Sequence, residues 1–176
     1  MYNIGIITDG KNYNEKQLRE CFSKKKYAYN RFSSDSFDIC KTDSDYCISE
    51  YLCSEKIEIK EDIIVLCCEH IEGIKINNNA IVLLDSAEFS DYSALPENSM
   101  IISCGFGEKN SISLSSICDN AIVLNIAREV NGLEIQEFVI KINKPIENIY
   151  TAIFAYAVLI LTNKEEPPCI QDIKAI

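Results

Sequence analysis

The sequence contains one histidine, His70, and it lacks any Cys-x-x-Cys pair among its nine cysteines. Without that spacing, or another metal-like one, the cysteines are not expected to form a zinc or redox centre. Cys67 and Cys68 are adjacent within an apolar run, where both behave most simply as small apolar side chains. His70 follows Glu69 at the end of this run, and we interpret it as a surface side chain, although acid–base chemistry stays open.

No apolar run is long enough to cross a bilayer, so the sequence predicts no membrane insertion. The N-terminus also has no basic segment followed by a long apolar stretch, so we expect no secretion signal and a reduced, cytoplasmic protein. The formal net charge of −10 excludes nucleic acid and anionic membrane as bulk binding surfaces. The basic run at residues 24–26 is interpreted as the solvated end of a helix.

The first half of the chain alternates apolar runs with helical or loop segments. Continuous runs rich in β-branched residues predict strands that are buried on both faces, as in a parallel sheet covered by helices. These runs are residues 4–7, 63–68, 80–84 and 100–104. Residues 37–40 predict a further short strand. Periodic apolar residues predict helices over 15–25, with Leu18, Cys21 and Phe22 inward, and over 43–54, with Ile48, Tyr51 and Leu52 inward.

The second half has a different pattern from about Gly107 onward. Residues 111–117, 121–128 and 134–142 read as three strands joined by short turns, and the first alternates polar with apolar residues. Such alternation is typical of an antiparallel strand with one solvated face, so the three predict a meander. Residues 146–161 predict a helix that is apolar on nearly every side and therefore buried.

These segments together predict one α/β domain over residues 1–176. Its fold class is P-loop-like: a mostly parallel sheet flanked by helices, with a three-stranded antiparallel meander near the C-terminal half. We place the parallel part at about residues 1–106, and the meander with the buried helix at about 107–163.

The turn after the first strand carries the clearest functional signal. Gly5, four intervening residues and then Gly10-Lys11 have the spacing of a phosphate-binding loop, in which backbone N–H groups face an anion. Thr8, Gly10, Lys11 and Asn12 are therefore the candidate phosphate-binding residues. Asn12 stands where a Mg²⁺-binding hydroxyl is expected, and an amide oxygen is a poorer ligand there.

Three motifs in this order resemble the central ATP-binding domain of the Mur ligases. Residues 7–12 are similar to that family's loop, Thr-Gly-Thr-Asn-Gly-Lys followed by two hydroxyl residues. Residues 82–88 resemble its strand Leu-Asn-x-Asp-Asp, followed here too by a strand that ends in glycine. Residues 145–152 resemble Gly-x-His-Asn-x-x-Asn-Ala at the start of the family's buried helix.

The resemblance implies a nucleotide contact at Asn148 and, at most, weak binding of ATP and Mg²⁺. It also offers Glu69 as a weak candidate for a second metal ligand. Glu147 and Thr151 stand in place of the family's histidine and second asparagine, which weakens the implied adenine contacts. The N- and C-terminal domains of the ligases are not expected in this chain.

These departures lead to a hypothesis of a non-catalytic Mur-ligase-like domain that acts as a binding or interaction module. Its expected partner is another protein or a second copy of the chain, and no catalytic residue is assigned. A third hypothesis is a purely structural partner in a cell-envelope complex, which the sequence does not separate from the first. The alternative is a small P-loop ATP-dependent enzyme, a ligase, kinase or ATPase, that uses Lys11 and Glu69.

Overall fold

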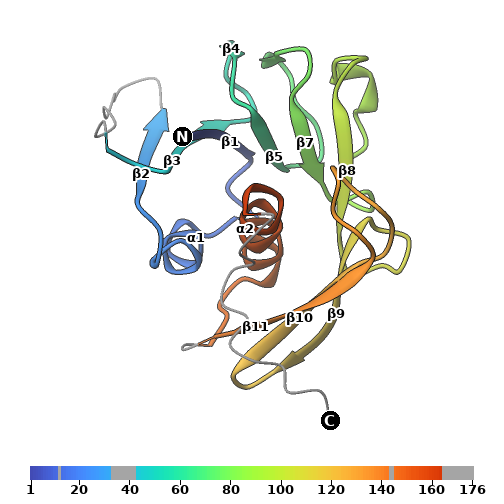
Figure 1. Ribbon diagram of the computed structural model, residues 1–176. Coiled ribbons are helices and arrows are strands. Elements are labelled where there is room, and N and C mark those ends of the chain that lie inside the picture. Colours follow the sequence, from blue (N-terminus) through green and yellow to red (C-terminus); the bar gives the residue numbers. More distant parts are fainter. Residues whose placement is uncertain (12, 33–42, 143–144, 164–176) are drawn as a thin grey trace.

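The computed structural model describes residues 1–11, 13–32, 43–142 and 145–163. They form a nine-stranded sheet with the order β11-β10-β9-β8-β7-β5-β1-β3-β2 (Figure 1). Neighbouring strands from β2 across to β9 are parallel, and β9, β10 and β11 are antiparallel. The predicted fold class, a mostly parallel α/β sheet followed by a meander, is confirmed. The strands are β1 (Tyr2–Thr8), β2 (Tyr27–Phe32), β3 (Tyr46–Leu52), β5 (Ile63–Cys67), β7 (Ile81–Leu84), β8 (Met100–Gly105), β9 (Ile112–Cys118), β10 (Ala121–Ile126) and β11 (Gln136–Lys141).

β1 lies among the parallel strands and pairs with β3 on one side and β5 on the other. Its last residue, Thr8, is opposite Leu52 and Cys67, so three strands end at the same level. The runs at residues 4–7 and 63–68 are buried as predicted, and so is 80–84 apart from the partly buried Ile81, because alternate residues face two separate apolar clusters. The run at residues 100–104 is buried only toward its end, since Met100 and Ile101 are exposed. Ile6 and Cys67 belong to one cluster, and Ile7 and Cys68 belong to the other.

The helix predicted over residues 43–54 is wrong, because this segment forms β3. Its apolar spacing fits a helix face, but β3 has a parallel strand on each side, and both ladders satisfy its backbone. Ser49 and Glu50 are buried within it, and Glu50 is accommodated by polar side chains of β2. The neighbouring strand β2 was not expected. The strand predicted over residues 37–40 lies outside the described residues.

Two helices cover one face of the sheet, with α1 and α2 on the same side in Figure 1. α1 (Glu15–Cys21) ends four residues before the predicted end, and Leu18 and Phe22 are buried as expected. α2 (Ile149–Thr162) starts three residues later than predicted, because Asn148 caps it. Ile153 and Phe154 are buried against the sheet, as the all-apolar sequence of this helix predicted.

The opposite face of the sheet has no α-helix among the described residues. It packs against the connections β3–β5, β5–β7 and β7–β8. These hold only the short strands β4 (Glu58–Ile59) and β6 (Lys75–Ile76) and the 3₁₀-helix η1 (Tyr92–Ala94). Ile59, Ile76 and Phe89 from these connections bury their side chains in the second cluster.

The meander leaves the parallel part of the sheet at the end of β8. β9 pairs with β8 only at Cys104 and Gly105, and then continues beyond it. The link between β10 and β11 contains an Asn131-Gly132 pair in which both residues have positive φ (50° and 76°), as expected for the short turn predicted there. In Figure 1 the meander passes the side of α2 away from α1, so the sheet curves around this helix. Within the described part of the chain, no helix is both long and apolar enough to span a membrane.

Candidate functional site

The loop after β1 has the predicted glycine turn, but its own side chains occupy its backbone donors. The Gly10 N–H donates to Thr8 Oγ1 at 2.9 Å, and the Lys11 N–H donates to Asp9 Oδ1 at 2.9 Å. Gly10 has a φ of +82°, a conformation that favours glycine. The Lys11 side chain is 83% exposed, and its Nζ lies 3.8 Å from Asp9 Oδ2. Two amides that could bind a phosphate are therefore already hydrogen-bonded within the loop.

The first helix does not begin directly after this glycine turn. Asn14 caps it, and its side-chain oxygen accepts the Gln17 N–H at 2.9 Å. Glu15 then places a carboxylate in the first turn of a helix only seven residues long. A negative charge at this end offsets the attraction of a helix N-terminus for anions. Asn12, the fourth candidate of the loop, lies outside the described residues.

The starts of α1 and α2 are tied together by hydrogen bonds. The Asn14 N–H donates to Thr151 Oγ1 at 2.9 Å, and the Glu147 N–H donates to Gln17 Oε1 at 2.8 Å. Asn148 therefore lies at the same end of the sheet as the loop. Its side-chain oxygen accepts the Thr151 N–H at 2.8 Å as the cap of α2, so this polar group serves the helix.

The remaining sequence candidates are Thr8, which belongs to the loop itself, and Glu69 and His70, which follow β5. Thr8 is buried, with 1% of its surface exposed, and its hydroxyl holds the turn. Glu69 is exposed after β5, and its backbone carbonyl accepts the Ser90 N–H at 3.0 Å. His70 lies on the surface, 3.8 Å from Glu72. Over the described ranges, no cluster of three or more His, Cys, Asp or Glu residues is arranged to hold a metal ion.

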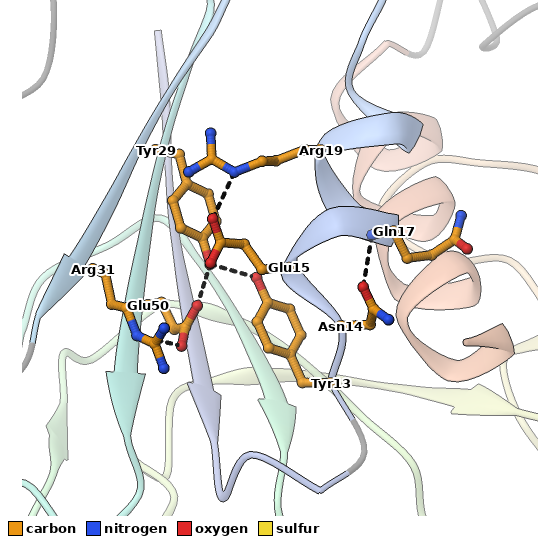
Figure 2. Close-up of polar contacts among 8 residues, drawn as sticks. All are labelled: Tyr13, Asn14, Glu15, Gln17, Arg19, Tyr29, Arg31 and Glu50. Carbon is orange, nitrogen blue, oxygen red and sulfur yellow. Dashed lines mark hydrogen bonds and ion pairs between the residues drawn. The ribbon is translucent and has the colours of Figure 1, made fainter. Parts of the chain in front are cut away.

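A buried polar cluster lies beside the loop, between α1 and the strands β2 and β3 (Figure 2). Glu50 of β3 is only 3% exposed, and it accepts a hydrogen bond from the Tyr29 hydroxyl of β2. The Tyr29 and Tyr13 hydroxyls are 2.7 Å apart, which extends this chain of hydrogen bonds to the residue that precedes the α1 cap. Arg31 Nε lies 3.3 Å from Glu50 Oε1 and supplies a positive charge.

The same cluster fixes the position of α1. The Arg19 guanidinium lies 4.2 Å from the centre of the Tyr29 ring and pairs with Glu15 at 2.7 Å. Burial raises the pKa of Tyr13 and of Tyr29 well above the usual range, so both phenols stay protonated and can donate. The arrangement rigidifies the segment after the loop and presents no free acid or base to a substrate.

A second polar cluster lies where β7 and β8 end. Asp85 is 6% exposed and Asn110 is 4% exposed, although neither belongs to the apolar core. Asp85 Oδ1 accepts the Ala87 N–H at 2.9 Å, and Asn110 Oδ1 accepts the Ser86 hydroxyl at 3.1 Å. The sequence drew attention to Asp85 only as a family remnant, and it gave no signal for Asn110, which no strand or helix contains.

An aromatic pair lies close to this cluster. The rings of Phe106, which is 48% exposed, and Tyr150 meet edge to face, with centroids 5.0 Å apart. Partial burial together with the nearby carboxylates of Asp85 and Glu88 raises the pKa of Tyr150. The carboxylates of Asp85 and Glu88 would repel a phosphate placed beside this ring.

The geometry defines an α/β protein whose parallel sheet continues into an antiparallel meander, with a capped rather than open loop after β1. No protein-family model matches the sequence, and comparison with curated proteins gives no match. Among solved structures, the fold is similar to a murein peptide ligase from Psychrobacter arcticus 273-4 (TM-score 0.53, 11% identity) and to MurF from Acinetobacter baumannii (TM-score 0.53, 12% identity).

These similarities extend over most of this chain but only part of the ligases. The first match covers 94% of this chain and 44% of the ligase, and the second covers 89% and 42%. The chain thus spans less than half the length of the solved ligases that it matches. At this level of identity the likeness establishes a Mur-ligase-like fold and leaves the chemistry to be argued from this chain's own residues.

Proposed function

We propose that this protein is a degenerate Mur-ligase central domain that acts as a binding or interaction module and does not transfer phosphate. In this proposal residues 1–176 form one domain, and the protein works in the cytoplasm. The similar fold of the two ligases supports the ancestry. The expected partner is another protein or a second copy of the chain, because a net charge of −10 disfavours nucleic acid.

One observation carries the proposal: the loop after β1 hydrogen-bonds its own amides. A phosphate-binding loop works because its N–H groups point at the anion with no competing acceptor. Here Thr8 Oγ1 and Asp9 Oδ1 accept from Gly10 and Lys11. A phosphate would have to break both hydrogen bonds, each with a net value of about 1 kcal/mol, before gaining any.

The negative charge of Asp9 also weakens phosphate binding at the loop. Its carboxylate lies 3.8 Å from the Lys11 ammonium and neutralises the one cation that the loop offers. Toward a phosphate at about 4 Å, the same carboxylate adds a repulsion of roughly 1–4 kcal/mol, depending on screening. Anion affinity at Gly10 and Lys11 is therefore expected to be millimolar or weaker.

The test is ATP turnover and ATP binding by the purified protein with Mg²⁺ or Mn²⁺. We expect no turnover above background and no rise in melting temperature at millimolar Mg-ATP, since a ligand that binds only the folded state must stabilise it. Lys11→Ala should behave like the native protein, as should the control Lys141→Ala at the exposed end of β11. Turnover near 1 s⁻¹ that disappears in Lys11→Ala alone would establish the P-loop enzyme instead.

A gain-of-function variant tests the reason given for weak binding. Asp9→Ala removes the acceptor of the Lys11 N–H and the charge beside its ammonium. Phosphate affinity, measured by titration of amide NMR shifts, should rise by at least about fivefold, the factor that corresponds to the low end of the repulsion by Asp9. Unchanged affinity in Asp9→Ala would mean that the loop fails for another reason than its own side chains.

A further inference from the structure

Asp85 and Asn110 bring a free acceptor and a free donor together at the carboxyl ends of β7 and β8. A Cβ atom built on Gly105 would lie 2.7 Å from Asp85 Oδ2 and 2.9 Å from Asn110 Nδ2, so the two atoms converge on one point. Gly105 also has a φ of +153°, which a side chain would not favour. The glycine therefore allows both polar groups to approach the backbone of β8.

Neither of the converging atoms has a protein partner within the described residues. The Asp85 side chain accepts its hydrogen bond through Oδ1, and the Asn110 side chain accepts through its single oxygen, Oδ1. In the same part of the chain, the side-chain polar atoms that are fully enclosed without a partner are Glu61 Oε2 and Ser99 Oγ. Asp85 Oδ2 and Asn110 Nδ2 are not among these enclosed atoms, so both retain contact with solvent.

The residues that carry these atoms are nevertheless more than nine-tenths buried and held in position. Asp85 is fixed by the Ala87 N–H and Asn110 by the Ser86 hydroxyl, so their free atoms keep a constant spacing. A preorganised donor and acceptor lose little entropy when a ligand binds, unlike mobile surface side chains. This distinguishes the pair from an ordinary group of surface acids.

We propose that Asp85 and Asn110 form a recognition site for a primary carboxamide. The amide N–H of the ligand donates to Asp85 Oδ2, and its carbonyl accepts from Asn110 Nδ2. A primary carboxamide carries both groups on one edge, whereas a trans secondary amide, including the peptide bond, carries them on opposite sides. Carboxylates and phosphates are disfavoured because Asp85 would repel them.

The inference deepens the proposed function and rests on it, since it names the group through which the module would recognise its partner. The carboxamide has two possible sources, an Asn or Gln side chain of a protein or a small aromatic amide. The exposed ring of Phe106 follows Gly105 directly and favours a ligand with an apolar body next to the amide. The probes below separate the two sources.

The test is titration of the native protein with benzamide, followed by amide NMR shifts of residues around Gly105. Benzamide should bind at millimolar concentration, and N-methylbenzamide and benzoate should bind at least about tenfold more weakly, because each loses one hydrogen bond or meets repulsion. N-acetylglutamine methylamide serves as the protein-like probe. If it binds as well as benzamide, the source is a protein side chain, and if benzamide binds better, the source is an aromatic amide.

Variants test the pairing itself. Asp85→Asn keeps an oxygen for the Ala87 N–H but replaces the free acceptor by a donor, so benzamide affinity should fall by about tenfold. Adding Asn110→Asp restores one donor and one acceptor with their positions exchanged. Benzamide should then bind again, with its amide in the reversed orientation. Equal binding of benzamide and N-methylbenzamide, tighter binding of benzamidine, or no binding of either amide probe would each overturn the proposal.

The result of the benzamide titration can be distinguished from the result of the ATP-turnover test. ATP turnover that depends on Lys11 would refute the non-catalytic role while leaving benzamide binding at Asp85 and Asn110 intact. Conversely, absence of benzamide binding would refute the carboxamide site without creating any ATP turnover. Both measurements use the same protein of residues 1–176, and unfolded variants are recognised by collapse of the amide NMR spectrum.

Discussion

Tyr29→Phe is the sharpest test of the polar cluster beside the loop, because it removes one oxygen atom and keeps the ring. That oxygen donates to the buried Glu50 and contacts the Tyr13 hydroxyl at 2.7 Å. A hydrogen bond to a charged group contributes about 1.5–3 kcal/mol, and one between neutral groups about 0.5–1.5 kcal/mol. Because Arg31 still faces Glu50 in the variant, we expect a total loss of about 2–4 kcal/mol in the free energy of unfolding.

The assay is urea unfolding at neutral pH, with the midpoint and the slope both fitted. A loss of this size lowers the melting temperature of a domain of this length by roughly 5–15 °C. Tyr92→Phe is the matched control: its ring is 45% exposed, and its hydroxyl makes no hydrogen bond within the described residues. It should change stability by less than about 0.5 kcal/mol. An equally small effect of Tyr29→Phe would refute the claim that this cluster fixes the segment after the loop.

Three further perturbations test the core and the site. Phe154→Ala should cost about 3–5 kcal/mol in urea unfolding, and a loss below about 1 kcal/mol would place α2 outside the core. Burial raises the pKa of the Cys21 thiol to about 11 and that of Cys68 to about 12. Because the unfolded chain ionises these thiols at a lower pH, their contribution to the free energy of unfolding is complete below about pH 9 and is lost as the pH rises toward these values. The urea midpoint should therefore fall over this range, and it should fall less in Cys21→Ala. Gly105→Ala should destabilise by about 1–3 kcal/mol, because the new methyl group meets a carboxylate oxygen at 2.7 Å, whereas Gly107→Ala has room and should be close to neutral.

Several strands of the parallel sheet could be predicted because a strand that is buried on both faces appears in the sequence as a continuous run of apolar residues. Val65 faces one apolar cluster and Leu66 the other, so every position between Ile63 and Cys68 is apolar. β3 was predicted as a helix because Ile48, Tyr51 and Leu52 have helical spacing, while the polar residues at 49 and 50 interrupt the apolar run that would have indicated a buried strand. The buried Glu50 is accommodated because β2 supplies Tyr29 and Arg31 as partners, and pairing between distant segments is not visible in local periodicity.

The sequence predicted where the glycine turn lies, but it did not predict that the amides of this turn are hydrogen-bonded to the loop's own side chains. The spacing of Gly5, Gly10 and Lys11 correctly indicated a glycine turn at the end of β1. The tendency of Asp and Thr side chains to bond a backbone N–H two residues ahead was also present at Thr8 and Asp9, and it is this local chemistry that occupies the loop. The convergence of Asp85 with Asn110, in contrast, depends on how β8 ends beside β7, which spacing along the chain does not encode.

Among the described residues, neither α1 nor α2 offers an anion an uncapped N-terminus at the carboxyl ends of the strands. Parallel α/β proteins bind anions at the carboxyl ends of their strands because helices begin there and present free N–H groups. In the described chain, α1 begins with Glu15 behind a side-chain cap, and the cap residue Asn148 of α2 hydrogen-bonds the Thr151 N–H. The connections that follow β3, β5 and β7 contain no α-helix at all. The proposed carboxamide site at Asp85 and Asn110 fits this arrangement, because a paired donor and acceptor favours a neutral, hydrogen-bonding partner over a phosphate.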